Sequence, residues 1–285
     1  MENTRYDYSP IISRKPFKLP NNARVAVWVI INVEYFDIGA TEGGGKKFAP
    51  DIIHYSTRDY GPRVGIWRLM ELLDRYNIKA TVSLNSDVCK HYPIIDEEGK
   101  KRGWEFMGHG YTQKSMQKVE NEAEDIRKTT EAIARATGKP PRGWLGPGLT
   151  ETWHTPDLLV EHGYRYVCDW VLDDQPVVLK TRTKPIVNLP YTQECNDVAM
   201  MLIQHHQGME YYQRASDQFD QLYEDSKDSA RVMALVVHPY IMGVPHRLKY
   251  YRMILEKVRA RRDVLFWTGE QILDWYLAQR PDALK

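Results

Sequence analysis

A continuous apolar stretch at residues 24–33 constrains the fold more than any other part of the chain. It is rich in Val and Ile and does not alternate between apolar and polar residues, as is typical of a strand covered on both faces of a sheet. Parallel sheets with helices on both sides bury their strands in this way. Glu34 follows directly. The sequence therefore predicts a buried strand that ends in a carboxylate at one edge of a sheet.

Shorter apolar stretches alternate with helical patterns along the rest of the chain. Strands are expected at residues 79–84, from 104, and at 164–168, 186–189, 231–237 and 264–267, and helices at 62–76, 119–137, 155–163, 215–228 and 247–261. Thr155-Pro156 and Thr268-x-x-Gln271 carry the signatures of helix starts. This order predicts parallel strands joined by right-handed crossovers. About seven such units favour one α/β domain over residues 1–285, an irregular (β/α) barrel with residues 1–22 as an extended N-terminal strap.

Composition excludes several classes of protein. The chain of 285 residues has a net charge of +1, which gives no basic surface for nucleic acid. Its three cysteines, Cys89, Cys168 and Cys195, are too widely spaced for a disulfide framework or a zinc knuckle. The N-terminus lacks a secretion signal, and no apolar stretch is long enough to span a bilayer. We therefore expect a soluble cytoplasmic protein without nucleic-acid or membrane partners.

Polar residues stand at or just past the ends of four expected strands. These residues are Glu34, His109, Asp169 and His238. In β/α barrels the chemistry lies at the carboxyl ends of the strands. His109 lies between Gly108 and Gly110, a context that presents a ring at a strand end, and Pro239 fixes the chain after His238. The structural alternatives are a carboxylate paired with an arginine and histidines satisfied within the core.

This constellation resembles the polysaccharide deacetylase superfamily, which includes chitin and peptidoglycan deacetylases. The resemblance covers about residues 24–276 and is greatest to the branch of allantoinases, cyclic imidases and intracellular peptidoglycan-deacetylase-like proteins. Its five motifs are matched, in order, by Asn32-Val33-Glu34, His109 to Gln113, Arg142 to Pro147, Asp169 to Asp174, and His238-Pro239. Gly243 to Leu248, and Leu189 to Thr192 followed by Asn196-Asp197, also look like this branch.

Two positions depart from the family pattern. Asn32 stands where the family usually has the carboxylate that acts as general base, which leaves Glu34 as the only acid of the first motif. Gln113 stands where the family has a second histidine. The resemblance implies zinc or another divalent metal held by Glu34, His109 and position 113, but a neutral amide oxygen is a poor zinc ligand. We therefore expect a metal that is weakly or partially bound, or none.

The implied activity is hydrolysis of a non-peptide C–N bond in an amide, imide or ureide. Water would be activated at Glu34 and His109, and His238 would protonate the departing nitrogen. The oxyanion would be stabilised by the metal or by a backbone N–H near Tyr111. Further candidate catalytic residues are Asn32, Arg142 and Asp169, and candidate substrate contacts are Tyr111, Trp144, Trp170 and Tyr191. Core packing is at least as common a role for a tryptophan.

Two long segments, residues 39–60 and 190–213, are predicted to cover the site, although they could instead build subunit contacts. Their tyrosines suit the enclosure of a small polar ring. These are Tyr55, Tyr60, Tyr191, Tyr211 and Tyr212. A small cyclic or linear amide is therefore favoured over acetylated sugars. Two alternatives stay open: an N-deacetylase of peptidoglycan or chitooligosaccharides, and a catalytically inactive barrel that binds a ligand. The resemblance also implies a homotetramer.

Overall fold

The computed structural model describes residues 2–39 and 50–285, so residues 40–49 of the loop predicted at 39–60 lie outside the described residues. The strands are Val25–Val33 (β1), Thr81–Leu84 (β2), Glu105–Gly108 (β3), Gly143–Trp144 (β4), Tyr166–Val167 (β5), Val177–Leu179 (β6), Ile186–Asn188 (β7), Arg231–Val237 (β8) and Val264–Phe266 (β9). The α-helices are Ile52–Tyr60 (α1), Ile66–Tyr76 (α2), Ser86–His91 (α3), Pro93–Lys101 (α4), Glu122–Thr137 (α5), Thr155–Glu161 (α6), Gly208–Asp225 (α7), Pro239–Met242 (α8), Pro245–Arg259 (α9) and Gly269–Gln279 (α10). Two π-helical segments are Gly61–Gly65 and Val198–Ile203.

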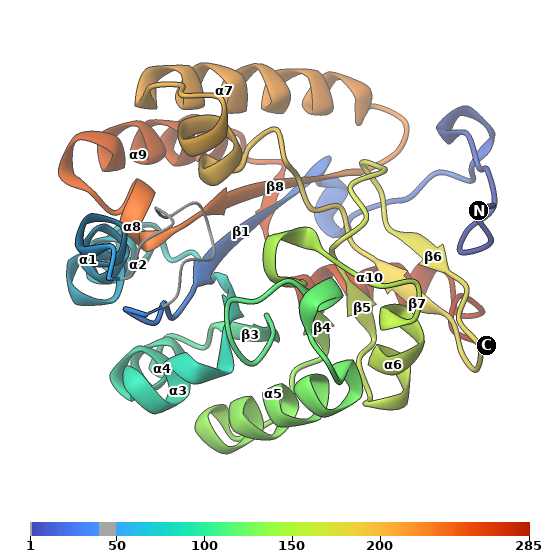
Figure 1. Ribbon diagram of the computed structural model, residues 1–285. Helices are drawn as coiled ribbons and strands as arrows, with labels where there is room; N and C mark the ends of the chain where they lie inside the picture. Colours follow the sequence, from blue (N-terminus) through green and yellow to red (C-terminus); the bar gives the residue numbers. More distant parts are fainter. Residues whose placement is uncertain (1, 40–49) are drawn as a thin grey trace.

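The strands form one curled sheet in the order β6-β7-β5-β4-β3-β2-β1-β8 (Figure 1). β9 pairs with the first part of β1, and β2 pairs with its second part. Every pairing is parallel except that between β6 and β7. This arrangement confirms the predicted α/β class and the irregular barrel. β4 and β6 were not predicted, because strands of two and three residues are too short to show a period.

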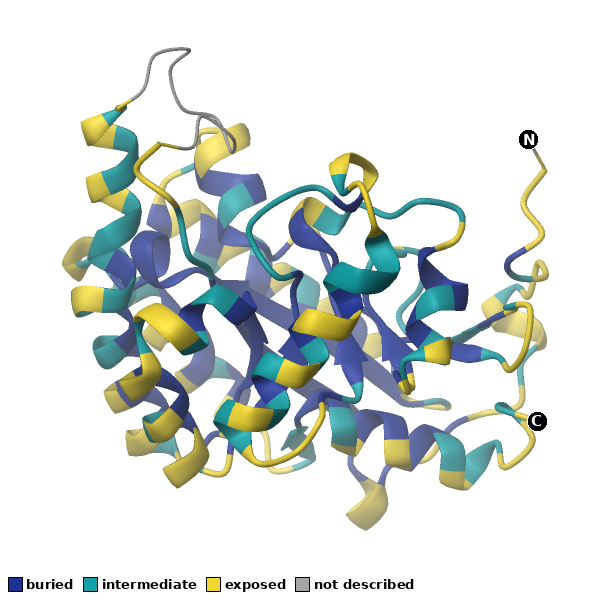
Figure 2. Cartoon of the chain, turned by 60° about the horizontal axis from the view of Figure 1, so that its bottom comes forward, coloured by how far each residue is buried: buried dark blue, intermediate teal, exposed yellow. Residues whose placement is uncertain are grey.

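β1 is buried along its whole length because both of its faces are covered (Figure 2). Its odd-numbered residues, from Val25 to Val33, belong to the core cluster that includes buried residues of α2, α7 and α9. Ala26, Trp28 and Ile30 point the other way, into a cluster with Tyr166 and residues of α10. The uninterrupted apolar stretch therefore reflects two cores rather than one.

The amino end of the sheet is closed by the start of α10. Glu105 is buried there and accepts hydrogen bonds from Thr81 Oγ1 at 2.7 Å, Tyr166 Oη at 2.6 Å and the backbone N–H of Glu270 at 3.1 Å. The predicted capping box of α10 is present, since the side chains of Thr268 and Gln271 each bond the other's backbone. Chemistry is therefore left to the opposite, carboxyl end of the strands.

Several helices differ from prediction. α1 occupies residues 52–60, which were predicted as loop, and none of its residues is buried, so it shows no apolar stripe. α7 begins seven residues before the predicted start at 215, with a capping box between Gln207 and Glu210. α3 and α4 were not predicted. Thr155 lies inside α6 rather than at its cap, which is His154. None of the helices in the described ranges is long and apolar enough to cross a bilayer.

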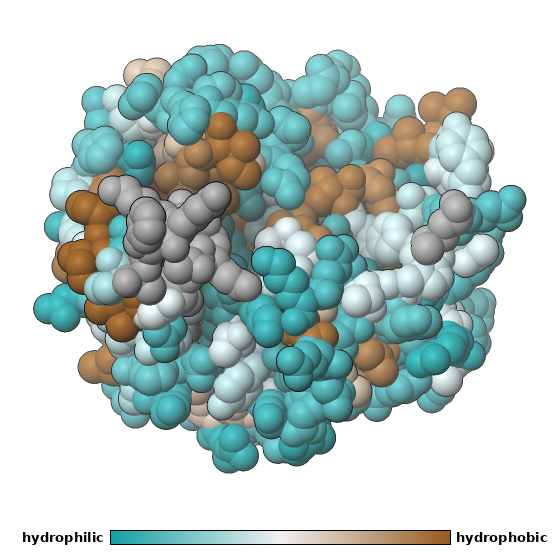
Figure 3. All heavy atoms as spheres, in the orientation of Figure 1, coloured by the Kyte–Doolittle hydropathy of each residue, from teal (hydrophilic) through white to brown (hydrophobic). Residues whose placement is uncertain are grey.

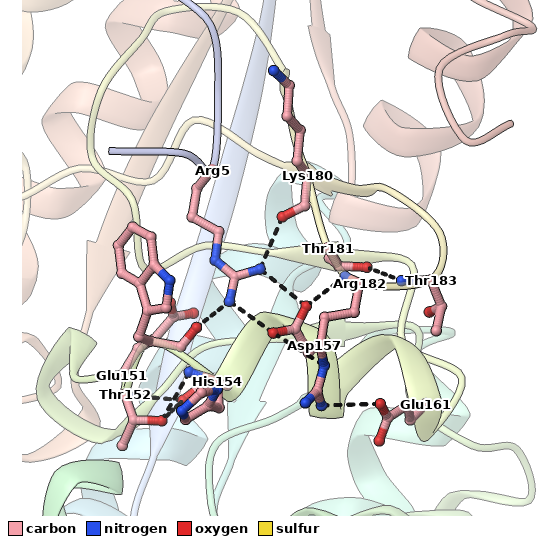
Figure 4. Close-up of polar contacts among 12 residues, drawn as sticks. Arg5, Glu151, Thr152, His154, Asp157, Glu161, Lys180, Thr181, Arg182 and Thr183 are labelled. Carbon is pink, nitrogen blue, oxygen red and sulfur yellow. Dashed lines mark hydrogen bonds and ion pairs between the residues drawn. The ribbon is translucent and has the colours of Figure 1, made fainter. Parts of the chain in front are cut away.

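The N-terminal strap packs on its own chain. The guanidinium of Arg5 pairs with both carboxylate oxygens of Asp157, at 3.0 and 2.8 Å, and also donates to the carbonyls of Lys180 and Trp153 (Figure 4). Phe17 and Leu19 are buried in the cluster that includes residues of α10. The strap therefore does not need a second subunit to cover it. Ile12 and Ile53 are among the exposed apolar side chains. Hydrophobic patches also lie on the face shown in Figure 3. The predicted homotetramer stays a prediction.

Candidate active site

Three predicted residues meet at the carboxyl end of the sheet. Glu34 follows β1, His109 follows β3 and His238 follows β8. Glu34 Oε1 lies 3.3 Å from His109 Nε2 and 3.8 Å from His238 Nε2. The side chains of Glu34, His109 and His238 are 6%, 3% and 7% exposed. One carboxylate oxygen therefore lies between two imidazole rings in a nearly water-free environment.

The two positions beside His109 require glycine for different structural reasons. A Cβ on Gly108 would lie 2.8 Å from both Trp144 and Tyr164, whereas Gly110 has φ +72°, a conformation that side chains rarely adopt. His109 Nδ1 lies 2.6 Å from the carbonyl oxygen of Leu145. A carbonyl can only accept, so Nδ1 carries a proton, and Nε2, which is directed at Glu34, donates to the carboxylate when the ring is the imidazolium. The ring is at a strand end as predicted, but it is buried.

His238 is held by Asp197, a residue to which the sequence analysis gave no role. Asp197 Oδ1 lies 2.6 Å from His238 Nδ1, and its Oδ2 accepts the backbone N–H of His238 at 2.8 Å. Burial lowers the pKa of His238, but the charges of Asp197 and Glu34 raise it more, so the net shift is upward from 6.5. His238 is therefore suited to hold a proton near neutral pH.

The pKa of Glu34 shifts in the opposite direction. Burial alone would raise its pKa, but the charge of His238 and the hydrogen bond and charge of His109, with a further contribution from Arg58, lower the pKa below 4.5. The carboxylate is thus ionised while His238 is protonated. A base and an acid with opposite pKa shifts in one cluster are the pattern expected of a proton-transferring site.

A cavity of about 10 Å³ adjoins Glu34. It is lined by Glu34, Phe36, Tyr55, Arg58, Asp59, Pro62 and Tyr92. This volume is close to the minimum that holds one water molecule. Tyr55, Arg58 and Asp59 come from α1. Sequence reasoning placed Tyr55 near the site but missed Arg58, because the segment was predicted as an irregular loop.

The side chains at the cluster do not fit a three-ligand zinc centre. Gln113 Nε2 donates to Glu34 Oε1 at 2.7 Å, so the amide nitrogen rather than the oxygen faces the carboxylate. Gln113 Oε1 is buried and has no hydrogen-bond partner within the described part of the chain. In residues 2–39 and 50–285 no three His, Cys, Asp or Glu side chains are grouped to hold a metal ion. Gln113 is a hydrogen-bond donor here and not a ligand.

Arg142 is not part of the cluster, which corrects its predicted catalytic role. It precedes β4 and so lies at the amino end of the sheet, where its Nη2 pairs with Asp274 of α10 at 2.7 Å. The residue that follows β4, Leu145, is the one that contacts His109. The arginine of this motif therefore lies at the end of the strand opposite to the cluster.

Asp169 also lies outside the cluster. Its Oδ1 accepts the backbone N–H of Gly146 at 2.7 Å, and it forms a buried acid pair with Glu151, which in turn accepts the indole N–H of Trp170 at 2.8 Å. Burial and the partner's charge raise the pKa of Asp169, and burial first of all raises the pKa of Glu151 to about 7. Both carboxyl groups therefore hold a proton to a higher pH than a free carboxyl group does.

This pair predicts a pH-dependent stability. The folded state retains a proton that an unfolded Glu151, with a pKa near 4.5, releases, so the wild-type protein loses stability as the pH rises from 4.5 to about 7. Glu151→Gln supplies a neutral N–H donor at every pH. The free energy of unfolding of the variant, relative to that of the wild type, should rise by about 3 kcal/mol across this window. Urea unfolding at pH 5 and pH 8 measures this difference, and parallel pH dependences for the two proteins would disprove the raised pKa of Glu151.

Asn32 faces Tyr191 rather than Glu34. Its Nδ2 donates to Tyr191 Oη at 3.4 Å, and Asn196 Nδ2 donates to the same oxygen at 3.3 Å. Tyr191 also lines a cavity of about 560 Å³ between the strap and the edge of β8. The role of general base assigned by position to Asn32 is not supported, since an amide is not basic and its N–H is engaged.

The remaining predicted contacts lie outside the cluster as well. The backbone N–H of Tyr111 donates to Asp125 at 3.1 Å, so it is not an open oxyanion donor. Trp144 is fully buried against Tyr164, so it packs in the core and does not contact a substrate. Trp170 packs edge-on against Tyr6 of the strap. Segment 190–213 does not cover the cavity at Glu34: it provides Asp197, π-helix Val198–Ile203 and the start of α7, in which Tyr211 is buried.

Residues 46–167 match the family model for polysaccharide deacetylase. A peptidoglycan deacetylase of Helicobacter pylori is 26% identical to this chain and covers 86% of it and 95% of its own length. Over most of its length, the chain is therefore similar to polysaccharide and peptidoglycan deacetylases. This finding confirms the resemblance drawn from the five motifs. In this chain Gln113 is a donor to Glu34.

Solved structures agree with the assignment of the fold. PuuE allantoinase superposes with a TM-score of 0.87 at 23% identity, over 96% of this chain and 99% of that one. A protein of Pseudomonas aeruginosa PAO1 described as a probable polysaccharide deacetylase superposes with a TM-score of 0.83 at 24% identity, over 92% and 94%. The chain therefore has the deacetylase-like barrel along nearly its whole length.

Proposed function

We propose that this protein hydrolyses a non-peptide C–N bond of a small amide, imide or ureide, with Glu34 as general base and His238 as general acid. The observation that carries the proposal is the contact of Glu34 with His238, 3.8 Å apart, with the two pKa values shifted in opposite directions. The similarity to a peptidoglycan deacetylase and to an allantoinase supports the reaction class, because both names denote cleavage of a C–N bond by water.

The proposed reaction has two proton transfers. Glu34 takes a proton from a water molecule as its oxygen attacks the carbonyl carbon, which gives a tetrahedral oxyanion. His238 then gives its proton to the nitrogen as the C–N bond breaks, and the products are a carboxylic acid and the departing N–H compound, which is an amine, an amide or a urea. The proton on Glu34 returns to His238, which restores both groups. Asp197 holds the imidazolium in place through the 2.6 Å contact to Nδ1. His109 and Gln113 fix the carboxylate from the other side at 3.3 and 2.7 Å.

A small substrate is supported by the position of α1 beside Glu34. Three residues of α1 line the adjoining cavity of about 10 Å³, whereas a polymer requires an open groove. The N-deacetylase alternative is favoured by the name of the Helicobacter pylori relative, and it predicts acetate release from chitooligosaccharides or peptidoglycan fragments. The inactive-barrel alternative predicts no turnover of any amide.

A panel of substrates decides among these readings. Allantoin, hydantoin, succinimide, chitooligosaccharides and peptidoglycan fragments are incubated with the wild-type protein, with added zinc and with a chelator. Glu34→Gln is the matched control, because it keeps the size of the side chain. Ring opening of a small compound by the wild type alone supports the proposal. Acetate release from the oligosaccharides without any ring opening would replace it by the deacetylase alternative.

The donor set at the cluster predicts little metal. We propose that purified protein contains well under one equivalent of zinc and loses it to a chelator, because, with His238 held as the acid by Asp197, the cluster leaves one carboxylate and one imidazole as ligands. Gln113→His supplies a second imidazole and should raise the zinc content. Elemental analysis of both proteins after dialysis tests this. A full equivalent of chelator-resistant zinc in the wild type would show that another residue completes a metal centre.

A further inference from the structure

One peptide group, between Leu145 and Gly146, connects the cluster to Asp169. Its carbonyl oxygen lies 2.6 Å from His109 Nδ1, and its N–H donates to Asp169 Oδ1 at 2.7 Å. The C=O and N–H of a trans peptide group lie in one plane and point in opposite directions. β4, which precedes this peptide group, pairs with β3 on one side and with β5 on the other. The carbonyl therefore faces the strand end that carries His109, and the N–H faces the strand end that carries Asp169.

The two hydrogen bonds of this peptide group strengthen each other. A carboxyl oxygen that accepts the N–H of Gly146 polarises the amide, so that negative charge increases on the carbonyl oxygen of Leu145. That oxygen becomes a better acceptor for the Nδ1 proton of His109. The effect is greatest away from water, and the His109 side chain is 3% exposed. Because Nδ1 is held in this way, Nε2 lies on the side of Glu34, 3.3 Å from its Oε1.

Asp169 has a defined position behind the peptide group. A Cβ on Gly146 would lie 3.0 Å from Asp169 Oδ2 and 2.4 Å from the carbonyl oxygen of Thr150, so glycine is needed for this close approach. Asp169 Oδ2 and Glu151 Oε1 are buried and have no partner outside their own pair in residues 2–39 and 50–285. The two carboxyl groups are hydrogen-bonded to each other, which requires a proton on at least one of them. Asp169 Oδ1 is therefore fixed by contacts on the far side of its own carboxyl group.

We propose that Asp169 is a positioning residue that acts on His109 through this peptide group. By accepting the N–H, its carboxyl group holds the carbonyl as the acceptor that directs His109 at Glu34. This inference rests on the proposed function, in which His109 helps to fix the general base. It gives a role to the two motif matches at residues 142–147 and 169–174, because the first supplies the peptide group and the second supplies its acceptor.

A structural role alone predicts a different result. Any acceptor for the N–H of Gly146 stabilises the segment after β4, because an unpaired N–H inside the protein costs free energy. A variant without the acceptor would then unfold at a lower urea concentration. Its folded molecules would keep the Nδ1 hydrogen bond of His109 and the wild-type kcat. Measurements on the folded variants therefore separate the two roles.

Kinetics of Asp169 variants test the proposal on whichever compound of the panel is turned over. Asp169→Ala removes the acceptor and should lower kcat by about tenfold or more, with a smaller change in KM, because a displaced general base slows the reaction more than it weakens substrate binding. Asp169→Asn keeps an oxygen for the N–H of Gly146 and supplies a donor to Glu151. Its kcat should therefore lie within about threefold of the wild-type value.

Asn188→Ala is the matched control. The side chain of Asn188 holds the residue next to Asp169 by two hydrogen bonds, because it donates to the carbonyl of Trp170 at 2.7 Å and accepts the N–H of Trp170 at 3.3 Å. The variant loosens the same segment but leaves the acceptor of Gly146 in place, so its kcat should stay within about threefold of the wild-type value. A loss of kcat equal to that of Asp169→Ala, or a failure of Asp169→Asn to restore the rate, would overturn the proposal.

A second measurement does not depend on turnover. In protein with isotope-labelled histidine, the Nδ1 proton of His109 is identified as the downfield NMR resonance that is lost in His109→Gln. This resonance should be unchanged in Asp169→Asn and Asn188→Ala. In Asp169→Ala it should move to higher field and exchange with water about tenfold faster. Asp169→Leu, which fills the same space without an acceptor, takes the place of Asp169→Ala if that variant does not fold.

The outcomes for Asp169 and for the proposed function are distinct. The wild-type resonance of His109 in a folded Asp169→Ala or Asp169→Leu variant, or a wild-type protein without this resonance, would overturn the role of Asp169. Absence of turnover by the wild type counts against the proposed function instead, because the NMR comparison needs no substrate.

Discussion

Replacing Glu34 by glutamine should lower kcat by about a thousandfold or more, the largest effect expected of any single change in this protein. Glutamine keeps the length of the side chain and an oxygen that accepts the 2.7 Å bond from Gln113, but it cannot take a proton from water. KM should change little, because Glu34 acts on the attacking water rather than on the substrate. Steady-state kinetics on the active compound of the panel measures both quantities.

The control for Glu34→Gln is a measurement of the stability of the folded variant. The variant removes a buried charge beside two imidazoles, so its unfolding midpoint should not fall below that of the wild type by more than a few degrees. A folded variant that keeps at least a tenth of the wild-type kcat would exclude Glu34 as the base. Loss of activity together with loss of structure would be resolved by Glu34→Asp, which keeps a carboxylate and should retain measurable turnover.

Replacing His238 by alanine should lower kcat by about a hundredfold or more, as expected for loss of a general acid. The loss should be greatest for a substrate whose leaving nitrogen is strongly basic and smallest for an imide, because a less basic nitrogen needs less proton transfer to depart. Comparing an alkyl amide with succinimide measures this dependence. Equal losses for both substrates, or a wild-type rate in the folded variant, would remove His238 from the acid role.

Asp197→Asn tests the effect of Asp197 on the pKa of His238 separately from its effect on the position of His238. The asparagine keeps an oxygen for the backbone N–H of His238, which lies 2.8 Å from the present carboxylate. It removes the charge that raises the pKa of His238. The variant should therefore keep its activity at low pH and lose it at a lower alkaline pH than the wild type does.

The central residues could be predicted because they follow strands whose apolar pattern is unambiguous. Glu34 and His238 come directly after β1 and β8, where all residues are buried, and parallel strands bring their carboxyl ends together. Applied strictly, the same rule rejects Arg142, which precedes β4. The catalytic role of Arg142 was predicted from the motif resemblance and not from its place relative to the strand. His109 was found from its two glycines, which the structure explains by close packing and by a positive φ.

Asp197 and Arg58 could not be assigned from the sequence for physical reasons. Asp197 lies in an irregular segment, and its burial depends on β8, which pairs with the neighbouring Asn196 from far along the chain. Arg58 lies on α1, where no residue is buried, so the helix shows no apolar period that could reveal its face. Both residues act through tertiary contacts. Their local sequence carries no sign of those contacts.

The pH dependence of kcat/KM for the wild type tests the acid–base assignment most directly. Glu34 must be ionised and its pKa is lowered from 4.5, so the acid limb should lie below pH 4.5. His238 must be protonated and its pKa is raised from 6.5, so the alkaline limb should lie above pH 6.5 and should be absent in His238→Ala. The account predicts a bell with a flat top between these limbs. A rate that rises through neutrality and stays high in alkali, or an alkaline limb that persists in His238→Ala, would contradict it.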